Sequence, residues 1–276
     1  TLQQAKSSLG VSIAREWKRH KWLYGMAIPG VLIVFLFNYV PMYGILLAFK
    51  DYRIKEGILG SPWVGFKYFE MFFSNPLAVR TIKNTFLLGL YNLLWSFPAP
   101  IILALLFNEL KNQRFKKIIQ TISYYPNFVS TVIIIGMLST FCASDGIFND
   151  IRGIFGAEPV NFMGEPEYFR TLYIASGIWQ GVGFGTIIYL ASLSGVAPTL
   201  YDVADIDGAS RLAKIWHITL PHLKPTIVIL LIMAVGGTFG ADSNKILLMY
   251  SPATYSTADV IGTYTYREGI QGAQFE

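Results

Sequence analysis

Charged side chains are scarce in this sequence. Asp, Glu, Lys and Arg make up 14% of its 276 residues, against about 25% in a typical soluble domain. Apolar residues make up 53%, and the mean hydropathy is +0.44. So little charged surface does not cover so large an apolar mass in water. These values exclude a disordered chain and a nucleic-acid-binding domain, and they indicate a protein that crosses a membrane several times.

Cysteine and histidine are nearly absent. The single Cys142 excludes an intramolecular disulfide framework, and its apolar neighbours favour a packing role. Of the three His, His20 lies in a basic flank, while His217 and His222 are separated by five positions. That spacing does not favour a shared helical face, and no third ligand is near. We therefore expect no metal site and no cofactor bound by this chain.

Motifs for catalysis are also missing. The sequence has no Gly-x-x-x-x-Gly-Lys-Ser/Thr loop, so we do not expect this chain to hydrolyse ATP. Gly181-Val-Gly-Phe-Gly185 lies in an apolar run, where small residues let helices pack closely. No Ser-His-Asp set and no carboxylate pair suggests a reaction centre. We therefore expect a protein that is not an enzyme.

Long apolar runs are what the sequence has in excess. A helical span needs about 20 residues. Four runs reach that length, and a fifth reaches it only with flanking residues such as Ile218–Leu223 and Ile246–Met249. The predicted fold class is therefore all-α, a polytopic helical membrane protein. The five runs are Trp22–Phe49, Ile82–Phe107, Ile118–Cys142, Leu172–Leu193 and Thr226–Phe239.

Prolines occur inside several of these runs. Membrane helices tolerate proline where neighbouring groups satisfy the backbone atoms that it frees. Two interpretations stay open, a simple kink or a broken helix that lines a pathway. The prolines are Pro29, Pro41, Pro98, Pro100 and Pro126.

The distribution of Lys and Arg predicts the orientation. These residues are dense in Arg15–Lys21, in residues 111–117 and in residues 211–224. Because cytoplasmic segments are enriched in basic residues, we predict a cytoplasmic N-terminus, with residues 1–21 an amphipathic segment and residues 22–276 the transmembrane domain. The net charge of +5 then follows from this bias. Residues 51–80 and 143–168 become outside loops, and the aromatic residues of the first suit an interfacial helix.

The predicted inside loop, residues 196–224, has an unusual composition. Thr199 is expected to cap a short helix through Ala204, and Gly208 to provide a turn. A second amphipathic helix follows, with Leu212 and Trp216 near one face. The loop either rests on lipid headgroups or docks in the groove of a partner. Carboxylates at positions 202, 205 and 207 favour docking, because an anionic leaflet would repel them.

This loop resembles the EAA loop of permeases from binding-protein-dependent ABC importers. It reads Asp202-Val-Ala-Asp-Ile-Asp-Gly-Ala209, followed by Ile218-Thr-Leu-Pro221. Gly208 and Leu220-Pro221 match the family in identity and spacing. Asp202 stands where the family usually has Glu, and Val203 where it has Ala. The resemblance implies that this acid contacts an Arg of the ATPase, and here the shorter side chain of Asp202 would have to make that contact.

The resemblance extends over nearly the whole chain. The subfamily that it points to imports complex oligo- and polysaccharides, and its type I permease fold has six core spans. Five spans are visible here, and the resemblance implies a sixth after Glu276. The stretches that carry the resemblance are residues 38–51, Ser61-Pro-Trp-Val-Gly-Phe66, residues 97–110, residues 114–117 and Ile122-Ser-Tyr-Tyr-Pro126.

The resemblance implies a role and a set of partners. The chain would form half of a translocation pathway for an oligo- or polysaccharide in the bacterial cytoplasmic (inner) membrane. Its partners would be a second homologous permease, two ATP-binding subunits that hold ATP and Mg, and a periplasmic solute-binding protein. The coupling residues carried over from the family are Asp202, Ala204, Asp207, Gly208, Ala209, Leu220 and Pro221.

Polar and aromatic residues inside the runs are candidates for the substrate pathway. Sugars bind to aromatic faces and to amide or hydroxyl groups, and transporter sites lie near the membrane midplane. Packing and interhelical hydrogen bonds are the alternative explanation for each candidate. The candidates are Tyr91, Asn92, Trp95, Asn127, Trp179, Gln180 and Tyr189.

Two other functions are possible for a protein with several membrane spans, a secondary carrier or channel and a membrane-embedded enzyme. A secondary carrier or channel would work without an ATPase, but its coupling groups are usually ionisable, and no carboxylate or basic residue lies in the middle of a run. A membrane-embedded enzyme would need a catalytic constellation at the interface. The sequence therefore favours the permease of an importer, for a saccharide whose identity and charge it does not specify.

Overall fold

The structure is a computed structural model that describes residues 2–238 and 240–272, with side chains for Trp17 and from Arg19 onward. The side chains that would make residues 1–16 amphipathic, Phe239 of the fifth run and residues 273–276 lie outside the described residues. The described part is helical apart from one isolated bridge between Lys50 and Trp63. The predicted all-α class is confirmed. The chain divides into two units that meet between Phe72 and Phe73.

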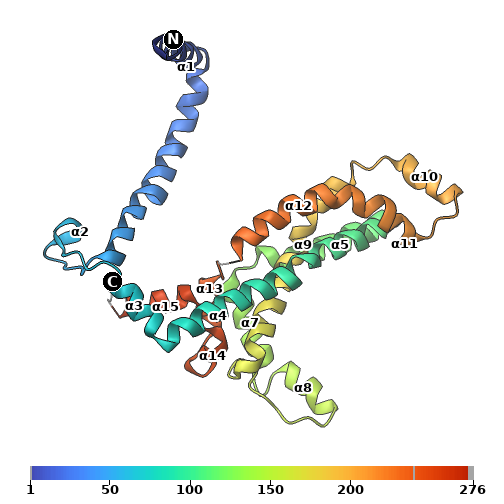
Figure 1. Cartoon of the computed structure of the whole chain (residues 1–276). Coiled ribbons are helices and arrows are strands. Elements are labelled where there is room, and N and C mark those ends of the chain that lie inside the picture. Colours follow the sequence, from blue (N-terminus) through green and yellow to red (C-terminus); the bar gives the residue numbers. More distant parts are fainter. Residues whose placement is uncertain (1, 239, 273–276) are drawn as a thin grey trace. The chain divides into compact units, whose positions relative to one another are not determined.

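The first unit contains one long helical segment. Helix α1 (Leu2–Val34) has non-helical dihedral angles at His20 and continues as a π-helical turn, Phe35–Tyr39, and a 3-10 segment, Val40–Phe49 (Figure 1). Pro41 lacks an N–H group, and its ring crowds the preceding turn, so a regular α-helix does not pass through it. The π and 3-10 turns absorb this change of register.

Aromatic contacts fold the following stretch onto the end of this segment. The ring of Phe49 stacks on Trp63 with centroids 5.5 Å apart and contacts Phe66 and Phe69. Lys50 Nζ donates to two carbonyl oxygens near α2 (Gly57–Gly60), each at 2.9 Å. Helix α3 (Lys67–Ser74) lies in the region where the sequence predicted an interfacial helix.

The five apolar runs correspond to five segments that are long and apolar enough to cross a membrane. Four of the segments are longer than predicted because polar helix ends extend the apolar runs, whereas the third, Thr131–Ile154, omits residues 118–130 of its run and continues beyond Cys142. Helix α4 (Pro76–Tyr91), a π-helical turn (Asn92–Ser96) and α5 (Pro98–Glu109) form the second, and α9 (Pro166–Leu193) forms the fourth. The five are Arg19–Phe49, Pro76–Glu109, Thr131–Ile154, Pro166–Leu193 and Arg211–Gly237.

The third run is not one continuous helix, as its length had suggested. It divides into α6 (Gln113–Tyr124), a 3-10 turn (Tyr125–Phe128) and α7 (Thr131–Cys142), with α8 (Ile147–Ile154) beyond. Pro126 supplies no N–H group at the break. The side chain of Gln180 on α9 donates to the carbonyl oxygen of Val129 at 3.1 Å. The helix is broken here and not merely kinked, and α9 satisfies a carbonyl next to the break.

The fifth span begins earlier than the sequence suggested. Helix α11 (Arg211–Lys214) continues through a π-helical turn (Ile215–Thr219) into α12 (Leu220–Gly237). The π turn makes room for Pro221, which therefore does not end the helix. Half of the predicted inside loop thus belongs to the span. Ile246–Met249, which we expected to lengthen it, lies in a separate helix, α13 (Ser243–Met249).

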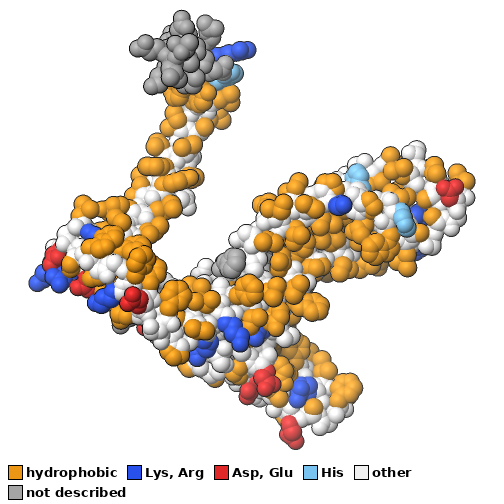
Figure 2. All heavy atoms as spheres, viewed as in Figure 1, with side chains coloured by type: hydrophobic (Ala, Val, Ile, Leu, Met, Phe, Trp, Pro, Cys, Tyr) orange, Lys and Arg blue, Asp and Glu red, His pale blue; other side chains and the backbone are white. Residues whose placement is uncertain are grey.

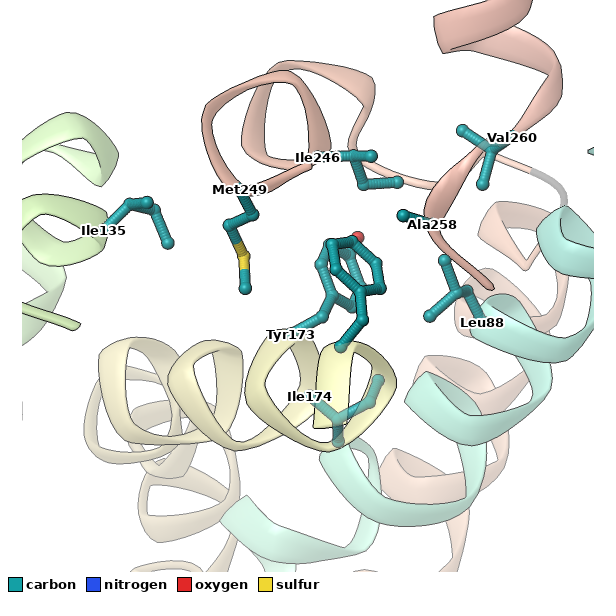
Figure 3. Packing of buried hydrophobic residues seen from close by; sticks show 9 residues of the cluster. Leu88, Ile135, Tyr173, Ile174, Ile246, Met249, Ala258 and Val260 are labelled. Carbon is teal, nitrogen blue, oxygen red and sulfur yellow. The ribbon is translucent and has the colours of Figure 1, made fainter. Parts of the chain in front are cut away.

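Two clusters of buried side chains hold the second unit together. One joins α4, α7, α9 and the last segment of the chain, with Tyr173 and Met249 near its centre (Figure 3). The last segment comprises α13, a 3-10 turn (Pro252–Thr254), α14 (Tyr255–Ala258), α15 (Ile261–Thr265) and a π-helical turn (Tyr266–Gln271).

The second cluster lies where α5, α9 and α12 meet the inside loop, and contains Ala104, Tyr189, Leu193, Val196 and Leu223. Most other apolar side chains are exposed, as Figure 2 shows over α5 and α12. A lipid-facing surface has this composition.

Candidate coupling corner and substrate pathway

The inside loop folds into a helical corner, residues 198–219, called here the coupling corner. It begins with α10 (Pro198–Ile206), whose N-cap is Ala197. The predicted cap at Thr199 is wrong. Proline fits the first helical position because its missing N–H would have no partner there, and the helix thus starts at Pro198, two residues earlier than a cap at Thr199 would place it.

A glycine makes the turn between the two helices of the corner. Gly208 has φ +73°, a left-handed conformation that favours glycine after a helix end. The N–H of Ala209 donates to the carbonyl oxygen of Ala204 at 2.9 Å, which closes the end of α10. Ser210 Oγ accepts from the N–H of Ala213 and caps α11. The predicted turn at Gly208 is confirmed.

The corner is tied to the spans behind it. The hydroxyl groups of Tyr201 on α10 and Thr219 lie 3.0 Å apart, and Thr219 is buried. Tyr201 and Ile218 pack against the second cluster. Lys214 Nζ forms an ion pair with Asp205 at 2.6 Å across the turn. These contacts hold α10 against the start of α12.

The outer side of the corner is apolar and uncovered within the described chain. Val203 is 56% exposed, Ile206 85% and Trp216 65%. Figure 1 places α10 and α11 at one end of the helices α5, α9 and α12. Exposed apolar side chains on a helix beside carboxylates are typical of a helix that docks in a groove.

The structure brings the predicted coupling residues together in two places. Asp202, Ala204, Asp207, Gly208 and Ala209 form the corner itself. Asp202 and Asp207 are exposed, whereas Ala204 and Ala209 are half-buried. Leu220 and Pro221 begin α12, directly after Thr219, through which the corner is tied to the span.

Only two of the predicted pathway residues line the same cavity. Tyr91 and Trp95 face a hollow of about 510 Å³ that Glu167 and Arg170 also line. Asn92 lines a different hollow, of about 340 Å³, with Ser96 and Thr238.

The other pathway candidates lie elsewhere. Asn127 lies in the break of the third run, before the membrane segment that begins at Thr131. Gln180 holds the edge of that break through its bond to Val129. Trp179 lines a hollow of about 480 Å³ beside α7, and Tyr189 is 3% exposed within the second cluster. Sequence reasoning also missed Phe128, which lies next to Asn127, is 75% exposed and contacts Phe184 edge-to-face at 6.0 Å.

A buried polar network was also missed. The carboxylate of Asp259 is fully buried and accepts two hydrogen bonds from Arg267, at 3.1 and 3.0 Å. It accepts a third from Thr263 at 2.9 Å, and Arg80 lies 3.8 Å away. Hydrogen bonding to Asp259 raises the pKa of Arg267 above its usual value. An acid in an otherwise uncharged stretch, eight residues before an Arg, was the only signal in the sequence.

A second polar residue ties this network to the spans. The side-chain amide of Asn84 on α4 donates to the carbonyl oxygens of Ser256 and Asp259, and its oxygen accepts from Arg170 on α9 at 2.9 Å. The last segment of the chain is therefore fixed to α4 and α9.

Comparison with known proteins decides the family. Residues 72–267, which include the whole coupling corner, match the family described as binding-protein-dependent transport system inner membrane component. The chain belongs to this family of permeases. The prediction drawn from the EAA-like motif is therefore confirmed, and a carrier that works alone is not favoured.

Individual relatives agree with this assignment. The permease is 43% identical over 258 residues to the polygalacturonan/rhamnogalacturonan transport system permease protein YteP of Bacillus subtilis, covering 93% of this chain and 80% of that protein. A solved bacterial ABC transporter involved in the import of the acidic polysaccharide alginate superposes with TM-score 0.88 at 41% identity, covering 96% of this chain and 89% of that one.

A second solved structure is that of a bacterial alginate ABC transporter in complex with an alginate pentasaccharide-bound periplasmic protein. It superposes with TM-score 0.86 at 41% identity, covering 95% of this chain and 87% of that chain. At this identity and coverage the agreement extends over nearly the whole chain, and it confirms the type I permease fold instead of a likeness of single helices.

Lys245 of this permease gives a prediction for pH dependence. Its Nζ donates to the carbonyl oxygen of Tyr173 at 2.8 Å, and the residue is 6% exposed. Burial lowers the pKa of Lys245 to about 8, and the charge of Asp242 offsets part of the effect. An unfolded Lys has a pKa of about 10.4. Between these values the unfolded chain holds a proton that the folded chain lacks, so stability rises with pH there.

We expect the free energy of unfolding to gain up to about 1.4 kcal/mol per pH unit from this group above pH of about 8, and nothing below it. Lys245→Met removes the group and should remove this gain. Thermal unfolding in detergent at about pH 7.5 and about pH 9.5 measures the difference between the two proteins. Equal changes with pH in both would contradict the assignment.

Proposed function

We propose that this permease forms half of the membrane pathway of an ATP-driven importer for acidic oligo- or polysaccharides. The observation that carries the proposal is the coupling corner, an exposed apolar surface joined by Tyr201 and Thr219 to a membrane span. The substrate class is supported by the relatives, which are named for polygalacturonan and rhamnogalacturonan transport and for alginate import.

The proposed assembly follows from the same corner. Two ATP-binding subunits hold ATP and Mg and receive the corner of this permease and that of a second, homologous permease. A periplasmic binding protein delivers the saccharide from the other side, as in the relative solved with its periplasmic protein. ATP hydrolysis then belongs to the partners, and this chain carries out no reaction.

The orientation is proposed from charge. Ala104, in the middle of α5, packs in one cluster with Leu193 at the end of α9. The basic segments after α5 and around α11 therefore lie at the end of the bundle that bears the corner. Because basic residues accumulate on the cytoplasmic side, that end is cytoplasmic, as is the N-terminus, and the protein spans the inner membrane several times.

The pathway would use alternating access. Closure of the ATPases moves α10, and the contacts of Tyr201 and Ile218 pass the movement to α12 and α9. The hollow beside Tyr91, Trp95 and Arg170 offers aromatic faces for sugar rings and a guanidinium group for a carboxylate. Asn127, at the break of the third run, is the next residue that we place along the pathway, because broken helices often hold transporter sites.

Reconstitution tests this proposal. The permease is placed in liposomes with its partner permease, the ATPases and a binding protein loaded with an oligouronate, and ATP-dependent uptake is measured. Trp95→Ala is expected to lower uptake about 3- to 10-fold, because a stacking surface is lost. Trp22→Ala, at an exposed Trp of the first span, is the control and should change uptake little. Uptake that needs neither ATP nor the ATPases would refute the proposal.

A further inference from the structure

One face of α6 carries basic residues followed by apolar residues. The proposed coupling to the ATPases does not explain this arrangement. Arg114, Lys117, Ile118, Thr121 and Ile122 line an open hollow of about 510 Å³. They follow one another at intervals of three, one, three and one residues, which places them along a single face of the helix. We call this face the basic–apolar stripe.

The polarity of the stripe runs along the helix axis. Its two cations lie in the first turns of α6, and its isoleucines follow toward the break of the third run. Over the eight residues from Arg114 to Ile122 the helix rises about 12 Å. A ligand that matched the stripe would therefore carry negative charge at one end and an apolar chain at the other.

The stripe is uncovered and its charges are not neutralised within the described part of the chain. Ile118 is 57% exposed and Ile122 66%. Among the described residues no ion pair involves Arg114 or Lys117. The opposite face is occupied: Gly183 of α9 lies so close to the carbonyl oxygen of Ser123 that a Cβ would overlap it.

The position of the stripe agrees with a membrane interface. Residues 110–112 connect α5 to α6, and the second half of α5, which precedes this connection, begins at Ala104, which packs with Leu193 and Val196 in the second cluster. The cations thus lie at the end of the bundle that carries the coupling corner, and the isoleucines lie deeper along the spans. Basic pockets at this level of membrane proteins bind the headgroups of anionic lipids.

We infer that the basic–apolar stripe of α6 is a binding site for one anionic phospholipid, whose phosphate contacts Arg114 and Lys117 and whose acyl chain lies along Ile118 and Ile122. Because α6 ends at the break of the third run and packs on α9, a bound lipid stabilises this broken run from outside the pathway. The inference is independent of the sugar that the transporter carries.

The test uses the assembled transporter in detergent and titrates dioleoyl phosphatidylglycerol in native mass spectrometry, with dioleoyl phosphatidylcholine as the neutral lipid. The anionic lipid is expected to bind more tightly. In the double variant Arg114→Gln, Lys117→Gln its affinity should fall about 25-fold, or about fivefold for each cation, with the affinity for phosphatidylcholine unchanged. Equal affinities for the two lipids in the unaltered transporter would overturn the inference.

A matched variant separates the stripe from general surface charge. Lys111→Gln, Lys116→Gln removes the same charge from positions outside the stripe, since Lys111 precedes α6 and Lys116 is half-buried on another face. It should keep most of the affinity for phosphatidylglycerol. An equal loss in this variant would show that only the net charge of the surface matters, and would overturn the site.

Two further measurements keep the inference testable if the double variant does not assemble. Glycerol 3-phosphate, which has a phosphate and no acyl chain, is added as a competitor. If an equal concentration displaced the lipid, the site would bind anions without an acyl-chain groove, and the inference of a lipid site would be overturned. A photoactivatable phosphatidylglycerol is crosslinked to the unaltered transporter, and the labelled peptide is expected to lie within residues 114–122. Labelling confined to other segments, as when another subunit covers α6, would overturn it.

Discussion

Asp259→Ala is expected to destabilise the permease more than any other single substitution considered, by about 3–5 kcal/mol. Asp259 is fully buried, and the substitution leaves Arg267 without the carboxylate that accepts its two hydrogen bonds. The Arg267 side chain is 21% exposed, and a charge held mostly out of water without its partner keeps most of the cost of its desolvation. Because Asn84 binds the carbonyl oxygen of Asp259, the last segment should detach from α4 and α9 at a lower temperature.

Glu268→Gln is the matched control. Glu268 also lies near Arg267, at 3.4 Å, but its side chain is 40% exposed. Water screens such a pair, so we expect a change of less than about 1 kcal/mol. Thermal unfolding of the purified protein in detergent compares the two variants. Similar losses in both would show that burial of Asp259 does not determine the energy of this network.

Gly208→Val is expected to uncouple the permease from its ATPases without unfolding it. The φ of Gly208 is +73°, and a residue with a Cβ is destabilised there by about 1–2 kcal/mol. No atom beyond its chain neighbours lies within 4 Å of an added Cβ, so the cost falls on the backbone of the turn. The docking conformation of the corner should therefore be populated about 5- to 30-fold less.

Binding-protein-stimulated ATP hydrolysis by the reconstituted transporter measures this effect, and it should fall by a similar factor. Gly156→Val is the control, because Gly156 also has φ +73° with open space around it, but lies in the connection after α8. Its backbone strain is the same and its distance from the coupling corner is large in sequence. If Gly208→Val kept full stimulated hydrolysis, the corner would not transmit ATPase closure.

Much of the protein could be predicted from local sequence patterns. The fold class and the five spans follow from runs of apolar residues, because the membrane imposes a minimum length on each helix. The turn of the coupling corner followed from Gly208, because such a turn depends on neighbours in the sequence, whereas the helix that leads into the fifth span begins at Arg211, before the Leu220-Pro221 pair. The family assignment rested on those same residues and is confirmed by the match over residues 72–267.

The remaining features depend on contacts between distant residues. The break at Pro126 became visible only with Gln180, 51 residues away from the Val129 carbonyl oxygen that it binds. The burial of Asp259 required Asn84, which lies 175 positions away. The sequence also does not determine which of the aromatic and amide candidates share a cavity. A polar residue in an apolar run is suited to packing and to binding alike, and only its neighbours in space distinguish the two.

The sequence by itself therefore determined that this is a multi-span permease with a turn at Gly208 before its fifth span, because the membrane and the turn act on consecutive residues. Only the tertiary structure decided where the third run breaks, how the last segment is fixed to α4 and α9, and which face of α6 is left uncovered. Those outcomes depend on hydrogen bonds and packing between helices, and such contacts leave no periodic pattern in the sequence of one chain.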